Sequence, residues 1–305
     1  MGKYAIKRIF SAIVTLFLIA TITFFLMKLV PGGPFLAEKA PSAAVTAALE
    51  AKYGLDKPLN EQFFTYMADA MKGDFGPSIK QRGRNVADII AKGFPVSAKI
   101  GGISILISML IGIPLGCIAA LWRGKSVDNT IIVFATFGIS VPSFVVATIL
   151  MMIFSTQLGW LPTYGLSSGL HYIMPVAALS FYPIAYISRL MRSSMLDVLG
   201  QDYMRTAKAK GLSGFVTLFK HALRNAVLPV VTFLGPMLAY TLTGSFVVER
   251  IFTVPGIGNE FVSSIINRDY PMIMGTTIFL ATLLITMNVI VDIAYKVIDP
   301  RIKLN

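Results

Sequence analysis

The sequence predicts an all-α membrane protein with six transmembrane helices. Of its 305 residues, 55% are hydrophobic and only 14% are charged, and the mean hydropathy is +0.72. Soluble domains carry more charge and fewer apolar residues. Crossing the bilayer takes about 20 helical residues, and six uncharged stretches reach or approach that length. These stretches are residues 9–27, 100–121, 130–160, 172–188, 226–248 and 271–291.

The first stretch follows Lys3, Lys7 and Arg8, as the apolar core of a signal peptide would. Its apolar run is longer than such a core, and no small-residue cleavage site follows it. We therefore expect residues 1–30 to form a retained first transmembrane helix.

Residues 31–95 form the one sizeable segment predicted to lie outside the membrane. Helices are expected over 42–53 and 60–71, each followed by a glycine, with Ser42 and Asn60 as N-caps. Large apolar residues are few in this segment, so we expect it to pack on the membrane helices rather than to fold alone.

The distribution of positive charge predicts the orientation. More than half of the 27 Lys and Arg residues lie in the two termini and in the connections at 122–129 and 189–225. Short basic connections stay in the cytoplasm. Both termini are therefore expected on the cytoplasmic side, with 31–95 outside and residues 96–305 forming a five-helix core. This topology explains the net charge of +12 without a nucleic-acid partner.

Several spans contain proline, which membranes tolerate where a neighbouring helix or a water-filled cavity satisfies the freed backbone carbonyl. Prolines favour a bundle with a pathway, although they are common in membrane helices in any case. Within the spans no acid is placed to couple transport to protons or sodium. If the chain is a transporter, the energy for transport must then come from outside the chain.

Polar side chains at membrane depth are candidates for lining such a pathway. The alternative role for each is a hydrogen bond between helices. The candidates, together with one proline, are Thr136, Ser140, Pro142, Ser143, Tyr182, Tyr186 and Asn288.

Residues 200–225 form a basic cytoplasmic loop, which contains the acid-free stretch RTAKAKGLSGFVTLFKHALRN. A short helix is predicted over 203–210, and Gly211 allows the backbone to turn after it. Beyond it, Phe215, Leu218, Phe219 and further apolar residues recur at helical spacing. The pattern predicts a helix-turn-helix elbow that either presents a knob to the cytoplasm or rests on anionic headgroups.

The connection before the last span contains Pro255, Gly256 and Gly258, a turn pattern. Asn259 is expected to cap a short helix that runs to Ile266. This loop lies outside in the predicted topology, where it either meets a partner or serves stability alone.

Two apparent motifs carry no chemistry. Residues 123–126 resemble the end of a phosphate-binding loop, but Ala119 stands where that loop needs a glycine. His171 and His221 fall on opposite sides of the membrane in this topology, and Cys117 is the single cysteine. We expect no nucleotide or metal site in this chain.

The basic loop resembles the EAA loop of ATP-binding-cassette importer permeases, whose pattern is Glu-Ala-Ala, three residues, Gly, nine residues, then Ile-x-Leu-Pro. Arginine replaces both the glutamate and the proline, as in the peptide branch of that family. Residues 51–79 and 244–275 are similar to outer loops of the B subunit of oligopeptide and dipeptide permeases. The positions that the resemblance implies for coupling to an ATPase are Arg205, Thr206, Ala207, Lys208, Gly211, Leu212, His221, Ala222, Leu223 and Arg224.

The resemblance implies the type I importer permease fold, with an extracytoplasmic insertion after the first helix. It implies a bacterial cytoplasmic-membrane permease for peptides that forms half of the pathway and is not an enzyme. The implied partners are a second permease, two ATPases that bind ATP and Mg, a solute-binding protein and membrane lipid. The loop implied to face the binding protein includes Glu249, Pro255, Gly256, Gly258, Asn267, Arg268 and Asp269.

Other readings stay open at this point. The same architecture is reused for nickel chelates, glutathione or oligosaccharides. A channel or carrier that works without an ATPase is the alternative from another class.

Overall fold

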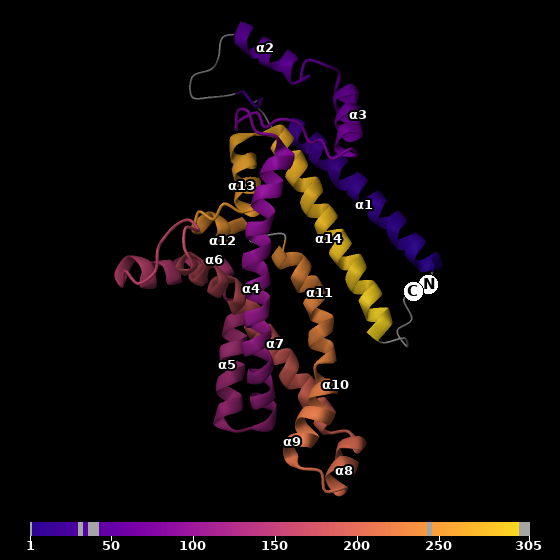
Figure 1. Ribbon diagram of the computed structural model, residues 1–305, viewed down its shortest axis with the longest axis vertical. Helices are drawn as coiled ribbons and strands as arrows, with labels where there is room; N and C mark the ends of the chain where they lie inside the picture. The colour runs from indigo at the N-terminus through magenta and orange to yellow at the C-terminus, as the bar shows by residue number, and fades with distance from the viewer. Residues whose placement is uncertain (1, 30–32, 36–42, 243–245, 299–305) are drawn as a thin grey trace. The chain divides into compact units, whose positions relative to one another are not determined.

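A computed structural model describes residues 2–29, 33–35, 43–242 and 246–298. This part of the chain contains helices and no β-strand, apart from an isolated bridge between Pro77 and Asn85. The helices, shown in Figure 1, are α1 (Gly2–Leu29), α2 (Ala43–Lys52), α3 (Leu59–Ala70), α4 (Val86–Leu121), α5 (Ser126–Ser140), α6 (Ser143–Leu150), η1 (Met151–Gln157), η2 (Gly169–Tyr172), α7 (Ile173–Leu199), α8 (Asp202–Ala209), α9 (Gly214–Val216), η3 (Thr217–Leu223), α10 (Arg224–Ala226), α11 (Leu228–Leu242), α12 (Phe246–Ile251), α13 (Ile257–Asn267) and α14 (Tyr270–Ile298).

Length and composition allow four of the described helices to cross a membrane as straight spans. They are Ile6–Leu29, Val86–Leu121, Gly169–Leu199 and Tyr270–Ile290, which correspond to four of the predicted stretches. The stretch 130–160 is not one straight helix, because its two halves are bent by 101° and make a fifth span only if taken together. The stretch from 226 contains the shorter helix α11. Six straight spans are therefore not seen in the described residues.

The bend in the third stretch has a local cause. Pro142 has no backbone N–H and disfavours helical geometry at the residue before it. Val141 is accordingly extended, with φ −89° and ψ 121°, and α6 begins directly after Pro142. Pro142 thus divides the predicted span into α5 and α6.

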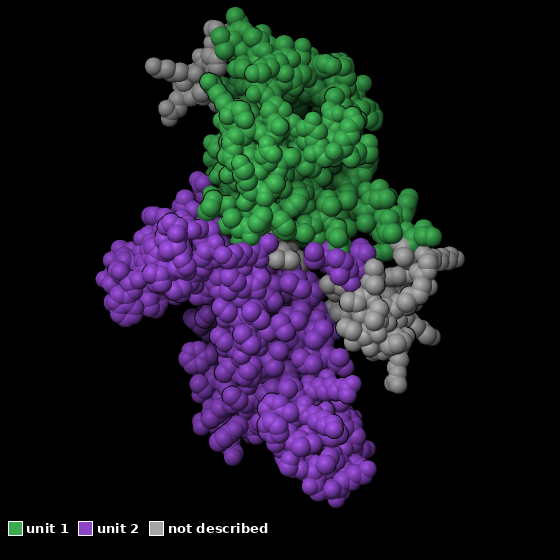
Figure 2. Space-filling model, viewed as in Figure 1, with its two compact units in different colours: residues 1–96, 255–286 green, residues 97–254, 287–305 purple. Residues whose placement is uncertain are grey.

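The chain forms two compact units, which are described separately (Figure 2). Unit 1 comprises residues 1–96 and 255–286, and unit 2 comprises 97–254 and 287–305.

In unit 1 the segment after α1 packs on that helix. The buried ring of Phe63 in α3 lies 5.3 Å from the ring of Phe24 and 6.1 Å from that of Phe17. This packing agrees with the expectation for residues 31–95, and α2 and α3 fall within two residues of their predicted bounds.

Two of the three predicted N-cap residues are not N-caps in the structure. Asn60 is not an N-cap, because α3 already begins at Leu59 after Pro58, whose fixed φ suits a helix start. Asn259 is not one either, since α13 begins at Ile257 after Gly256. Ser42 lies outside the described residues.

In unit 2, α4 and α7 approach closely along a row of small residues spaced four apart. Ser104, Ser108, Gly112 and Gly116 belong to this row. A Cβ added at Gly116 would lie 2.5 Å from Cβ of Met191. Small residues let membrane helices approach and form hydrogen bonds where no hydrophobic force drives helices together.

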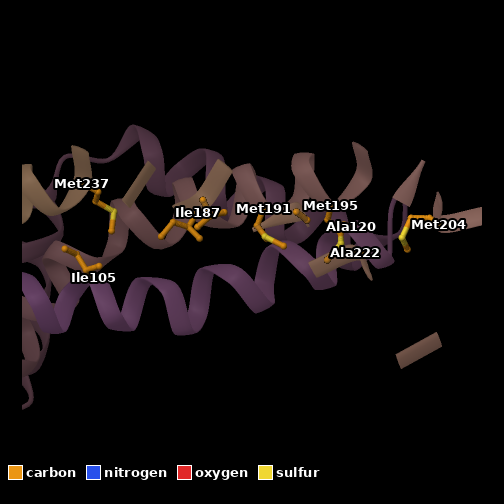
Figure 3. Close-up of a cluster of buried hydrophobic side chains, with 10 residues drawn as sticks. Ile105, Ala120, Ile187, Met191, Met195, Met204, Ala222 and Met237 are labelled. Carbon is orange, nitrogen blue, oxygen red and sulfur yellow. The ribbon is translucent and has the colours of Figure 1, made fainter. Parts of the chain in front are cut away.

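Serine hydroxyls reinforce this contact. Ser104 Oγ donates to the Val176 carbonyl at 3.3 Å, and Ser180 Oγ donates back to the Ser104 carbonyl at 3.2 Å. Toward the elbow, a core of Met191, Met195 and other buried residues continues the interface (Figure 3).

Candidate translocation cavity and coupling elbow

A cavity of about 580 Å³ lies inside unit 2, next to the bend between α5 and α6. Pro142 lies at that bend, and Pro183 and Pro236 lie inside α7 and α11. Each proline removes a backbone donor from its helix. The residues that line the cavity are Ile139, Ser140, Val141, Pro142, Ser143, Leu179, Tyr182, Pro183, Phe233, Pro236, Met237 and Thr241. Three prolines of the predicted spans therefore line one space.

Stacked aromatic rings form one wall. The Tyr182 and Tyr186 rings lie 6.0 Å apart at 29°, and the Tyr186 and Phe233 rings lie 4.0 Å apart at 25°. The stack links α7 to α11. None of the lining residues is an acid or a base, so the cavity offers apolar surface, hydroxyls and aromatic faces.

The position of α11 beside α4 is set by a close backbone approach. A Cβ added at Gly101 would lie 2.6 Å from the carbonyl oxygen of Thr241, so only glycine fits there. Thr241 Oγ1 donates to Met237 O at 2.7 Å within its own helix.

The structure places four of the predicted pathway residues in this lining, namely Ser140, Pro142, Ser143 and Tyr182. Tyr186 touches the lining through its ring stack. Thr136 lies one turn before Ser140, whose hydroxyl donates to the Thr136 carbonyl at 2.9 Å. Asn288 is half-buried on α14 and is not a lining residue, so it is not part of this cavity.

The sequence prediction missed the lining side chains of α11. Phe233, Pro236, Met237 and Thr241 were not among the predicted pathway residues. The signal that points to them is Pro236, since the other two prolines in the lining also interrupt spans.

The basic loop forms the predicted elbow. Helix α8 ends at Ala209, Gly211 adopts a left-handed φ of +73°, and a second helical segment runs through α9, η3 and α10. Ser213 caps that segment by accepting a hydrogen bond from Val216 N at 3.3 Å. Figure 1 shows α8 and α9 next to each other, below α10, and in the chain they lie between α7 and α11.

The inner face of the elbow is part of the core of unit 2. Met204 of α8, together with Ala222 and Ala226 of the second segment, belongs to the cluster that contains Met191 and Met195 of α7 (Figure 3). Ala207 is also buried. The elbow is thus fixed to α7 by apolar packing.

The outer face of the elbow combines exposed apolar and cationic side chains. Phe215 and Phe219 are 70% and 50% exposed, and their ring centroids are 4.5 Å apart. Leu212, Tyr203 and Arg205 are further exposed residues of the elbow. We call these five residues the elbow face.

The predicted coupling residues therefore divide into two groups. Arg205, Thr206, Gly211, Leu212 and Arg224 are exposed, and His221 and Leu223 are half-buried. Ala207 and Ala222 are buried, so they hold the elbow together and offer no side chain to a partner. The side chain of Lys208 lies outside the described part of the chain.

The second elbow segment contains a stretch of π-helix, Thr217–Leu223. Single π-helical turns are rare in proteins, and those that occur are often found at functional sites. Thr217 is buried, and its Oγ1 has no hydrogen-bond partner among the described residues. The elbow thus contains one unsatisfied polar group.

The loop before α14 is held inside unit 1 by Asp269. Its buried carboxylate accepts hydrogen bonds from the Ser78 hydroxyl, from Ile79 N at 3.1 Å and from Lys80 N at 3.3 Å. Gln81 Nε2 donates to Glu260 Oε2 at 2.7 Å nearby. These bonds join the loop to the segment that follows α3.

Some of the residues that were predicted to face a binding protein are buried. Glu249, Gly256, Gly258 and Asp269 are buried and present no side chain outward. Pro255 and Asn267 are exposed, and Arg268 is half-buried with a left-handed φ of +56° at the end of α13.

Long apolar helices, a neutral cavity lined by three prolines and an amphipathic elbow are the features of a multi-pass membrane permease. The chain belongs to the family described as "Binding-protein-dependent transport system inner membrane component", which it matches over residues 112–304. Residues 1–100 match the corresponding N-terminal family of such membrane components. A member of this family is a transport component and not an enzyme.

Curated relatives match over the whole chain. It is 49% identical to the dipeptide transport system permease protein DppB of Bacillus subtilis, covering 100% of this chain and 99% of the relative. It is 46% identical to the oligopeptide transport system permease protein OppB of Haemophilus influenzae, and the match covers 99% of this chain and 100% of the relative.

Solved structures show the same fold. A chain of the MetNI methionine ABC transporter matches with a TM-score of 0.56 at 16% identity, covering 69% of this chain and 96% of that chain. The fold is therefore that of ABC importer permeases.

Proposed function

We propose that this chain is the permease subunit of an ATP-driven peptide importer, in which it forms half of the translocation pathway. Its partners in this proposal are a second permease, two cytoplasmic ATPases that bind ATP and Mg, and an extracytoplasmic solute-binding protein. The chain crosses the membrane six times, with the bent pair and α11 each counted as one crossing and with both termini in the cytoplasm. The full-length similarity to dipeptide and oligopeptide permeases supports the choice of cargo.

One observation carries the mechanism: two of the helices that line the cavity, α7 and α11, are the two helices that the elbow joins. Leu179 and Tyr182 of α7 and Phe233 and Met237 of α11 face the cavity. Only two residues separate α7 from α8, and only Val227 separates α10 from α11. A displacement of the elbow is therefore passed directly to the two cavity walls that α7 and α11 form.

The elbow is built to transmit such a displacement. Its inner face shares a packed core with α7, and packed cores move as units rather than deforming continuously. ATP binding between the partner ATPases would pull on the elbow face, whose exposed rings and arginine suit a socket on another protein. Pro183 and Pro236 provide the points at which α7 and α11 bend.

The cavity lining suits peptides of varied side chains. A wall of hydroxyls, aromatic faces and apolar groups without charge neither selects nor rejects a particular ionised side chain. Choice of cargo is then left to the binding protein. An importer of nickel chelates, glutathione or oligosaccharides would share this architecture, and the ligand retained by the cognate binding protein would identify the cargo.

The elbow is tested with the variant Phe215→Ala/Phe219→Ala in a reconstituted complex. The variant should insert and assemble with the second permease, but substrate-stimulated ATP hydrolysis should fall at least about tenfold, since two exposed aromatic anchors are typical interface hot spots. Phe134→Ala, which removes an exposed ring from α5, is the matched control and should leave the rate unchanged. Normal stimulation in the double variant would show that the elbow face is not the coupling surface.

The cavity is tested with Ser140→Asp, which places a carboxylate in the neutral lining. Uptake of anionic peptides should fall more than uptake of cationic ones, because like charges repel in a poorly hydrated space. Ser126→Asp makes the same change at an exposed position of the same helix and should leave the ratio unaltered. An unchanged ratio in Ser140→Asp would place the pathway elsewhere.

The rival function, a channel or carrier without an ATPase, makes a different prediction. Vesicles that contain this chain without ATPase subunits should take up peptide under that hypothesis and not under ours.

A further inference from the structure

Unit 1 contains a second cavity, of about 310 Å³, which the transport mechanism does not use. It lies between the end of α1, helix α3, the loop that follows α2 and the start of α14. Phe24, Met27, Ile79, Tyr270 and Met274 supply apolar wall, and Lys28, Lys52 and Tyr66 supply polar groups.

The ammonium group of Lys28 is held in place at this cavity. Its Nζ donates to Gln62 Oε1 at 2.6 Å and lies 5.2 Å from the centre of the Tyr270 ring. Gln62 is itself oriented, since its Nε2 donates to the Leu55 carbonyl at 3.0 Å and to the Lys57 carbonyl at 2.7 Å. The cation is therefore positioned by a neutral amide and an aromatic face.

The charges at the cavity do not cancel. Of the acids in the lining, Asp69 pairs with Lys72 at 3.2 Å, and Asp74 keeps its charge while it accepts a hydrogen bond from Gly76 N at 2.9 Å. Within the described part of the chain, Lys28 makes no ion pair at contact distance, and Glu50 acts on it only through space. Lys52 lies over the Tyr53 ring at 5.9 Å. Two cations thus remain available to an anion.

A hydroxyl group adds to these donors. The Tyr66 oxygen is buried in the wall and has no hydrogen-bond partner among the described residues. Burial raises the pKa of the Tyr66 phenol, and the charge of Asp74 raises it further, so the group stays protonated. A buried hydroxyl without a partner is costly, and a ligand oxygen would satisfy it.

We propose that this cavity binds an anionic phospholipid, with its phosphate at Lys28, Lys52 and Tyr66 and an acyl chain against Phe24, Met27 and Met274. An ammonium-to-phosphate contact and a buried apolar wall are complementary to the two parts of such a lipid. Phe24 and Met27 of this wall belong to α1, the least buried of the four straight spans in the described residues, with 11% of its apolar window buried. The proposal does not depend on the transport function, because binding needs neither partner subunit nor ATP.

Native mass spectrometry of the full chain in detergent tests the proposal, with phosphatidylglycerol and phosphatidylcholine of identical acyl chains as probes. Wild-type protein should retain one phosphatidylglycerol in preference to phosphatidylcholine. Lys28→Met should weaken phosphatidylglycerol binding about tenfold, since it removes a charge-assisted hydrogen bond. Tyr66→Phe should weaken it by a smaller factor.

The matched control is Lys99→Met. Lys99 also lies over an aromatic ring, that of Tyr172 at 4.5 Å, but does not line this cavity. Its loss should leave lipid binding unchanged. Because Lys28→Met removes a contact within unit 1, Lys52→Met serves as a second variant that leaves the Gln62 hydrogen bond intact, and it should also weaken binding.

Three results would overturn the proposal. Equal retention of the two lipids would show that the phosphate charge is not recognised. Unchanged binding in both lysine variants would place any lipid elsewhere. Displacement of the lipid by a dipeptide at equal concentration would identify a peptide carboxylate, and not a lipid, as the occupant.

Discussion

Arg192 of α7 donates two hydrogen bonds to the buried carboxylate of Asp128 at the start of α5. Nε lies 2.5 Å from Oδ1, and a terminal guanidinium nitrogen lies 2.7 Å from Oδ2. Asp128 is 2% exposed and also accepts a hydrogen bond from Gly124 N at 2.9 Å. The pair fixes the short α4–α5 connection to the helix that leads into the elbow.

Asp128→Asn should lower the stability of the detergent-solubilised protein by about 2 kcal/mol, because it leaves a partly buried guanidinium without its counter-charge. The midpoint of thermal unfolding measures this loss. Asp202→Asn is the control, since Asp202 meets Arg205 at 3.5 Å in a fully solvated pair. That substitution should have no measurable effect. Equal shifts in both variants would contradict a special role for the buried pair.

Gly116→Ala should destabilise the protein by about 1 to 3 kcal/mol through overpacking. The new methyl group would lie 2.5 Å from Met191 Cβ and 2.6 Å from the Ser188 carbonyl, so α4 and α7 must separate. Gly102→Ala on the same helix meets no atom within 4 Å and should be neutral. Thermal unfolding of the two variants side by side decides the matter, and a neutral Gly116→Ala would refute the close approach.

Gly211→Pro should leave membrane insertion intact and abolish substrate-stimulated ATP hydrolysis in the assembled complex. Proline holds φ near −65°, whereas Gly211 has φ +73°, so the turn between α8 and α9 cannot form. The control is Gly214→Pro, at the first position of α9 behind an extended Ser213, where proline is tolerated. Uptake at a normal rate in Gly211→Pro would show that the turn is not needed for coupling.

Thr217→Val should raise stability by about 1 kcal/mol, because it replaces a buried hydroxyl that has no partner among the described residues with a methyl group of the same shape. Thr206→Val removes a hydroxyl that donates to Asp202 O at 3.1 Å on the exposed face of α8 and should bring no gain. Thermal unfolding in detergent compares the two, and a destabilised Thr217→Val would mean that this hydroxyl has a partner in the membrane or in a complex.

The elbow was predictable because its signals are local. A left-handed turn needs glycine, and an amphipathic helix shows its period in the sequence, so Gly211 and the Phe215, Phe219 spacing sufficed. The cavity was predictable in part: prolines and hydroxyls in the spans marked Ser140, Pro142, Ser143 and Tyr182. Asn288 does not line this cavity, and its place in the pathway stays a prediction, because a polar residue at membrane depth does not reveal which way its helix is turned.

Burial of individual loop and elbow residues was not predictable. Asp269 is an acidic residue in a loop and would be expected to face outward. Its carboxylate instead accepts a hydrogen bond from the backbone almost 200 positions earlier in the chain. Ala207 lies in the part of the basic loop that resembles the EAA loop, but its side chain packs inward. Such contacts depend on which distant segments meet, and no local pattern encodes that.

By itself the sequence determined that this is a helical membrane protein, where most of its long helices lie, and that a cationic elbow interrupts them, because hydropathy and backbone preferences act over neighbouring residues. Only the tertiary structure decided that α7 and α11 connect the elbow to the neutral cavity, and that Lys28, Lys52 and Tyr66 surround a second cavity. Those arrangements arise from close packing at small residues and from hydrogen bonds between residues far apart in the chain, which become visible only when the helices are in place.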